Sequence, residues 1–195
     1  MALPRRQLLT REQRQATILR GAAAAFARTG FAATSMEDVA TASGITKLIV
    51  YRHFASKEEL YRAVLESVSS RLAEEFLVGL EGPGPRGGIG ARTLLTVARE
   101  EPNGFVLLWR HAAREAPFAD YAQEHRQRAV GAARLLLGDR LDDEVLSRWA
   151  ADAIVDWLVE AVLGWLAVGD PERDEELLDL AHRTVVAMVT TWASR

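Results

Sequence analysis

The sequence contains no cysteine, which excludes disulfide frameworks, thiolate nucleophiles and thiolate metal sites. No two of its four histidines lie three to five residues apart, so a metal site built from neighbouring ligands is not expected. The chain also lacks the run of about 18 apolar residues that a membrane-spanning helix needs. No apolar stretch follows the first basic residues, as it would in a signal peptide. We therefore expect a cytoplasmic protein that binds neither a membrane nor a metal ion.

Charge is distributed unevenly along the 195 residues. Residues 1–57 contain nine Lys and Arg but three acidic residues, a net charge of +6, whereas the remainder carries −9. Hydrophobic residues make up 49% of the chain, which is enough for a packed core. A basic head on an acidic body indicates a polyanionic partner at one end of the molecule.

Apolar periodicity predicts an all-α protein of about nine helices, because no stretch shows the sustained alternation of a strand. The first helix is expected at about residues 11–29. Thr10 and Gln13 form a capping-box pattern at its start, and Gly30 is placed as a left-handed cap at its end.

Two short helices are predicted next. Ser35 can cap the first of them, with Asp38 as the reciprocal acid. Gly44 supplies the backbone freedom of the following turn, and Ile45 is expected as a buried plug beside it. The second short helix covers Lys47 to His53. Two short helices at a glycine turn, preceded by a packing helix in a basic segment, predict a helix-turn-helix.

The rest of the chain is also predicted to be helical. Ser56 with Glu59 is a capping box that starts a long helix of about 24 residues. Residues 82–90 are rich in glycine and proline and are interpreted as a connector. Further helices are expected at about residues 90–100, 104–115, 117–137, 143–168 and 172–193.

The stretch from Thr34 to Leu60 resembles the signature of TetR-type repressors. The shared elements are Thr-Ser, Val-Ala, Ser-Gly-Ile-Thr, Val-Tyr-Arg-His-Phe and Ser-Lys-Glu-Glu-Leu. The resemblance implies a three-helix DNA-binding domain over residues 1–56 and a helical effector-binding and dimerisation domain over residues 57–195. It also implies a homodimeric repressor that binds a palindromic double-stranded DNA operator and is released by a small apolar or aromatic effector. No cofactor and no enzymatic activity are expected.

Residue roles follow from the same resemblance. Ser35 is expected to cap the second helix and touch phosphate, Tyr51 and His53 to clamp the DNA backbone, and Lys57 to add charge at a helix N-terminus. Phe54 is interpreted as core. The positions that face the bases, with Met36 able to reach them, are Lys47, Leu48, Ile49 and Arg52.

Leu48 and Ile49 depart from the family pattern, which often has Gly or Pro at the first position and Thr at the second. Two bulky apolar side chains at the groove can contact thymine methyl groups. They can equally be packing residues that leave base readout to Lys47 and Arg52, and the residues alone do not decide between these interpretations.

The last two long helices are expected to form a four-helix bundle with their copies across a two-fold axis, because they are apolar over more than one face. A dimer would read two half-sites about 34–36 Å apart. The alternative is a monomer with a thick core. The residues assigned to the dimer interface are Ile154, Leu158, Ala161, Gly164, Trp165, Leu177, Ala181, Thr184, Val185, Met188 and Trp192.

An effector pocket is expected among the middle helices, because aromatic walls with a few polar groups suit an apolar or aromatic ligand. The alternative is that this aromatic stripe is ordinary core. The assigned pocket residues are Phe105, Leu108, Trp109, Phe118, Tyr121, His125, Trp157 and Trp165.

Two other classes of protein compete with this interpretation. The first is a helix-turn-helix DNA binder without an effector, which would not need the long helical body. The second is an enzyme, but no nucleophile, metal spacing or cofactor loop is present. Asp152, Asp156 and Glu160 lie at spacing four, which is typical of a solvated helix face.

Overall fold

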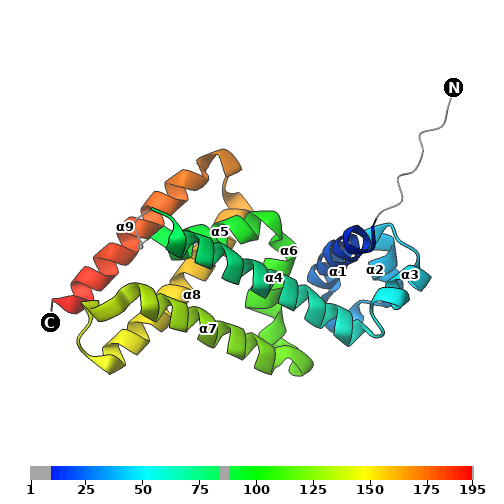
Figure 1. The fold of residues 1–195 in the computed structure, drawn as a ribbon, viewed down its shortest axis with the longest axis horizontal. Helices are drawn as coiled ribbons and strands as arrows, with labels where there is room; N and C mark the ends of the chain where they lie inside the picture. The colour runs from blue at the N-terminus through cyan, green and yellow to red at the C-terminus, as the bar shows by residue number, and fades with distance from the viewer. Residues whose placement is uncertain (1–9, 84–87, 195) are drawn as a thin grey trace. The chain divides into compact units, whose positions relative to one another are not determined.

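The computed structural model of the chain describes residues 10–83 and 88–194. Within these residues the chain forms nine α-helices with short 3₁₀ and π turns and no strand, which confirms the predicted all-α fold (Figure 1). It divides into two compact units, Met1–Glu66 and Ser67–Arg195. This division lies inside the helix Lys57–Glu81, whereas the sequence predicts that the functional domains meet at the start of that helix.

The first unit contains α1 (Arg11–Ala33), α2 (Met36–Ser43), α3 (Lys47–His53) and the start of α4 (Lys57–Glu81). The capping boxes predicted at Thr10 and Ser35 are both present. Gly44 has φ 64° and ψ 23°, the left-handed conformation that the turn before α3 requires. Gly30 has a positive φ of 80°, but its ψ of 164° differs from the predicted left-handed cap, and the chain resumes helical structure as far as Ala33.

Helices α1 and α2 pack closely because Gly21 has no side chain. A Cβ at this position would lie 2.6 Å from Ser43 Cβ and 2.7 Å from the Ser43 backbone. Fully buried side chains from all four helices complete the core of this unit: Ile18, Phe26, Val39, Val50 and Leu60. Ile45, which was predicted to be buried, is half-buried. The α2–α3 pair is therefore held on α1 by a dense core.

The second unit begins with the rest of α4 and ends with α9. Residues 84–87 of the predicted connector lie outside the described residues. The helix predicted at 104–115 is broken into a short α-helix, a π-helical turn and a 3₁₀ turn. The elements are α5 (Ile89–Glu100), α6 (Pro102–Val106), η2 (Leu107–His111), η3 (Ala112–Arg114), η4 (Ala116–Phe118), α7 (Ala119–Leu137), η5 (Gly138–Arg140), α8 (Glu144–Val168), η6 (Pro171–Arg173) and α9 (Asp174–Ala193).

Helix α8 packs against both α5 and α7 and forms the centre of this unit (Figure 1). Its turn into α9 is fixed by polar contacts around Asp174, whose carboxylate accepts hydrogen bonds from Arg99 and, at 2.7 Å, from Trp165 Nε1. These bonds, led by the one from Arg99, lower the pKa of Asp174. Among residues 10–83 and 88–194, no helix combines the length and apolarity that a membrane span requires.

Candidate nucleic-acid interface

Helix α3 has one buried side and one open side. Val50 is fully buried and Phe54 is 4% exposed, so both anchor the helix in the core of the first unit, as predicted for Phe54. On the other side Leu48 is 63% exposed and Tyr51 is 46% exposed, and Arg52 is exposed as well. Positions 48, 51 and 52 share a helix face because their spacings are three and four. The structure thus gathers an apolar, an aromatic and a cationic side chain on one solvent-facing surface.

Ile49 and Met36 lie elsewhere. Met36 is 6% exposed and belongs to the core, so the prediction that it reaches the bases is wrong. It sits directly after the cap of α2, where its side chain is buried instead of facing solvent. Ile49 is half-buried, as is His53. Of the two bulky residues that depart from the family pattern, Leu48 is therefore the one that is free to contact a partner.

Ser35 is exposed and caps α2 as predicted. Its Oγ accepts a hydrogen bond from the Asp38 N–H at 3.2 Å and donates one to the Asp38 carboxylate at 2.6 Å. The hydroxyl bond to the carboxylate, and with it the Ser35 backbone N–H that donates to the same carboxylate at 2.8 Å, lower the pKa of Asp38. The cap thus holds the start of α2 in place, and it puts a carboxylate beside the hydroxyl that was assigned to phosphate.

Lys57 is engaged within the first unit. Its Nζ donates to the carbonyl oxygens of Phe31 at 2.8 Å and Ala32 at 3.3 Å, and it lies 4.5 Å from the centroid of the Phe31 ring. The cation therefore compensates the carbonyl end of α1 and joins it to the start of α4. The expected role of Lys57 was to add charge for an anion at a helix N-terminus, whereas its ammonium contacts carbonyl groups far away in the sequence.

Lys47 forms a salt bridge with Glu37 across the turn, at 3.2 Å. Both side chains are at least half exposed, at 50% and 65%. Exposed pairs of this kind contribute little to stability and exchange partners readily. Lys47 is therefore available to a phosphate or a base edge at low cost.

The residues predicted to line an effector pocket all lie in the second unit. Phe105, Leu108, Phe118 and His125 are buried, whereas Trp109, Tyr121, Trp157 and Trp165 are half-buried. The structure brings three of them together, with ring centroids 6.2 Å apart for Phe105 and Trp109 and 4.9 Å apart for Trp109 and His125. Trp165 instead donates to Asp174 at the turn between α8 and α9.

His125 is the one titratable group in this aromatic cluster. Its Nδ1 lies 3.0 Å from the Ser69 hydroxyl on α4. Burial, with a smaller effect of the Arg128 charge, lowers the pKa of His125 to about 4, so the ring is neutral at pH 7. His125 Nε2 and Trp109 Nε1 are both buried without a hydrogen-bond partner.

The residues predicted for the dimer interface divide into two groups. Ile154, Leu158 and Ala181 are buried within this unit, so they serve its own core. The others are half-buried, apart from exposed Gly164: Ala161, Trp165, Leu177, Thr184, Val185, Met188 and Trp192.

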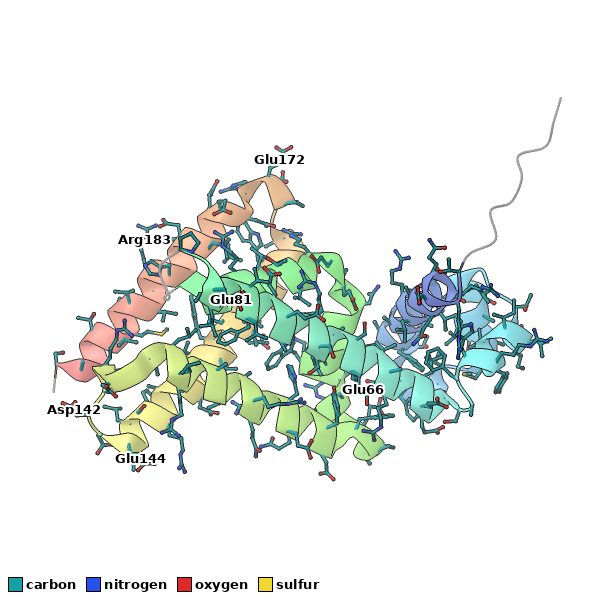
Figure 2. All side chains as sticks on the ribbon, in the orientation of Figure 1. Glu66, Glu81, Asp142, Glu144, Glu172 and Arg183 are labelled. Atoms are coloured by element: carbon teal, nitrogen blue, oxygen red, sulfur yellow. The ribbon has the colours of Figure 1, made fainter. Side chains whose placement is uncertain are left out.

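The same two helices expose apolar side chains that the sequence analysis missed. Trp149 and Leu180 are each 52% exposed and Val186 is 47% exposed. The Trp149 ring meets Trp192 edge-on at 5.0 Å, which joins α8 to α9. Charged side chains such as Glu144 and Arg183 project from the same helices (Figure 2). Helical periodicity identifies an apolar helix but not which of its apolar residues stay uncovered.

The geometry of the first unit defines a class of protein. A short helix is held at a glycine turn against two others, and it presents exposed Leu48, Tyr51 and Arg52, which is the arrangement of a helix-turn-helix DNA-binding unit. Residues 18–64 match the model of the family described as bacterial regulatory proteins, tetR family. The chain therefore carries the DNA-binding segment of the TetR family.

Among the curated relatives, two match part of the chain as follows. The HTH-type transcriptional repressor Rv3405c of Mycobacterium tuberculosis is 42% identical over 72 residues, which are 36% of this chain and 38% of that protein. The HTH-type transcriptional activator FasR of Mycolicibacterium smegmatis is 40% identical over 58 residues, 30% of this chain and 26% of that protein. The matched segment thus spans well under half the length of these relatives.

The fold is shared over nearly the whole chain. A TetR-like transcriptional regulator from Rhodococcus sp. RHA1 superimposes with a TM-score of 0.77 at 21% identity, covering 96% of this chain and 100% of that one. The likeness of the second unit therefore lies in its architecture.

Proposed function

We propose that this protein is a sequence-specific DNA-binding transcriptional regulator that acts as a homodimer on a palindromic operator. The observation that carries the proposal is the open face of α3, which exposes Leu48, Tyr51 and Arg52. A helix of this kind fits a major groove. Residues 1–56 would hold the DNA-binding function and residues 57–195 the effector and dimer functions. We expect the protein to act in the cytoplasm, where its proposed DNA partner lies.

We assign the roles of these residues on DNA from the exposure of their side chains and from the family pattern. Tyr51 and His53 are assigned to the phosphate backbone together with Ser35, in line with the family pattern. Lys47 and Arg52 are assigned to base edges, where basic side chains bind guanine. Leu48 is assigned to thymine methyl groups, because its side chain is exposed, whereas Ile49 is half-buried. Lys57 is not among the proposed phosphate contacts, since its ammonium caps α1.

The dimer is assigned to the exposed apolar face of α8 and α9. A short recognition helix contacts few base pairs, so a specific site requires two copies. Large apolar side chains on these two helices are exposed or half-buried, namely the Trp149 and Trp192 pair and Leu180, and a second copy would remove them from water. Sedimentation should show a dimer that Leu180→Asp weakens. The matched control is Leu135→Asp, at an equally exposed leucine on α7; equal behaviour of the two variants would reject this face.

A repressor released by an apolar or aromatic effector is the mode of action that we favour. The support is the aromatic cluster of the second unit, together with the repressor among the relatives, although another relative is named an activator. An effector that binds more tightly to a state of low operator affinity shifts the population toward that state and so weakens operator binding. Helix α4 runs through both units and is the proposed carrier of that change. A DNA binder without an effector is the alternative.

Selection from random DNA followed by footprinting tests the core of this proposal. A dimer-sized, partly palindromic footprint at moderate salt is expected. Arg52→Ala should lower the affinity for the selected DNA site. Arg134→Ala, which removes an exposed arginine of α7, should leave that affinity unchanged. Failure to enrich any sequence would reject the regulator. Thermal-shift measurements with a compound library then separate an effector-controlled regulator from a constitutive one.

A further inference from the structure

Two polar atoms in the aromatic cluster of the second unit are buried without hydrogen-bond partners, His125 Nε2 and Trp109 Nε1. Leaving such a group unpaired costs about 1–3 kcal/mol, so buried polar groups are nearly always satisfied. The two rings are in edge contact, with centroids 4.9 Å apart and planes at 71°. A molecule that binds one nitrogen therefore lies beside the other ring.

The chemistry of the two nitrogens limits what can satisfy them. Trp109 Nε1–H can only donate, so it requires an acceptor. The role of His125 Nε2 depends on Ser69. If the Ser69 hydroxyl donates to Nδ1, Nε2 carries the proton and donates. If Nδ1–H donates to Ser69, Nε2 accepts. A carbonyl oxygen suits the first arrangement and a hydroxyl suits both.

The surroundings limit the rest of the ligand. Fully buried Phe105 packs against Trp109, with ring centroids 6.2 Å apart, so the walls beside the polar pair are aromatic. His125 is neutral at pH 7 and therefore supplies no counter-charge for an acid. Trp109 lies on the π-helical turn Leu107–His111, and such turns recur at functional sites.

We propose that Trp109 and His125 form the polar end of the effector site and select an uncharged ligand with an apolar or aromatic body and a carbonyl or hydroxyl oxygen. The oxygen accepts the Trp109 N–H bond, and His125, oriented by Ser69, supplies the second bond. The inference rests on the proposed function, because it describes the ligand of the same effector unit.

A matched set of three probes tests this selection on the ¹⁵N-labelled full chain: acetophenone, ethylbenzene and benzoate. The indole signal of Trp109 is identified by its loss in Trp109→Phe, which keeps an aromatic ring and removes the donor. Acetophenone should move that indole proton downfield, whereas ethylbenzene should not. Acetophenone should also bind more tightly than benzoate.

Affinities of the variants give a second measure. Trp109→Phe should weaken acetophenone about fivefold, the effect of one net hydrogen bond, and leave ethylbenzene within twofold. Leu135→Ala, at an exposed leucine of α7, should change neither. The proposal is overturned if acetophenone does not shift the Trp109 signal, if ethylbenzene shifts it equally, if benzoate binds best, or if Trp109→Phe leaves the ketone affinity unchanged.

DNA selection with the same preparation separates this inference from the proposed function. If the protein enriches an operator but acetophenone leaves Trp109 unaffected, the ligand inference fails and the DNA-binding proposal stands. If acetophenone binds as expected but no DNA sequence is enriched, the regulator proposal fails and the ligand chemistry stands.

Discussion

Truncation of Leu48 gives the sharpest test of how α3 recognises DNA. Leu48 is 63% exposed, so Leu48→Ala removes apolar surface that the fold itself does not bury. Full burial of a leucine side chain stabilises by about 2 kcal/mol, so covering the exposed part is worth roughly 1.3 kcal/mol in each half-site. Two half-sites give about 2.5 kcal/mol, or a loss of roughly 60-fold in operator affinity.

The DNA provides the complementary change. Replacing thymine by deoxyuridine removes the 5-methyl group and keeps every hydrogen-bonding atom of the base pair. At the base pair that faces Leu48, this substitution should cost wild-type protein about 0.8 kcal/mol per methyl group. Leu48→Ala should be almost insensitive to it, because the partner of the methyl group is gone.

Fluorescence anisotropy with a selected operator and its deoxyuridine variants measures both effects in one double-mutant cycle. A melting curve of Leu48→Ala should match that of the wild type. The assignment is refuted if no thymine position is sensitive to methyl removal. It is also refuted if Leu48→Ala responds to deoxyuridine as strongly as the wild-type protein does.

Three further predictions concern the fold around the sites. Lys57→Met should lower the free energy of unfolding in urea by about 1–3 kcal/mol, because the Lys57 ammonium caps α1. The same change should leave the salt dependence of DNA binding unchanged. Arg52→Met should reduce that salt dependence if Arg52 contacts DNA. Gly21→Ala should destabilise by about 1–3 kcal/mol because the new Cβ meets the backbone of α2, whereas Gly131→Ala, in open space on α7, should be neutral or stabilising. Burial holds the pKa of His125 at about 4, below its ordinary value. The contribution of neutral His125 to the free energy of unfolding is therefore present above about pH 6.5 and is lost as the pH falls toward 4. His125→Phe should remove about 3 kcal/mol of this pH dependence.

Local signals accounted for most of the fold. The bounds of α3, the caps at Thr10 and Ser35 and the left-handed Gly44 were all predictable, because each depends on residues within one or two turns. The break of the segment at 104–115 into an α-helix, a π-helical turn and a 3₁₀ turn was not predictable, because no local signal in the sequence marks it.

The site was less predictable for the same reason. Lys57 pairs with the carbonyl of Phe31, 26 residues away, and His125 pairs with Ser69, 56 residues away. A residue type and a helical period cannot indicate such partners. Met36 illustrates the same limit, because its place next to a cap does not determine whether its side chain is exposed or buried in the core.

The contacts of the basic head also change the meaning of its charge. The net charge of +6 over residues 1–57 treats all nine basic residues alike. Lys57 is committed to α1, and Lys47 must leave Glu37 before it can neutralise a phosphate.

Only cations that replace condensed counterions on DNA contribute to salt-dependent affinity. That affinity applies to every sequence alike, so discrimination depends on contacts that differ between bases. The contact proposed for Leu48 on the open face of α3 involves no charge, so the specificity it would give should survive at salt concentrations that weaken the cationic contacts.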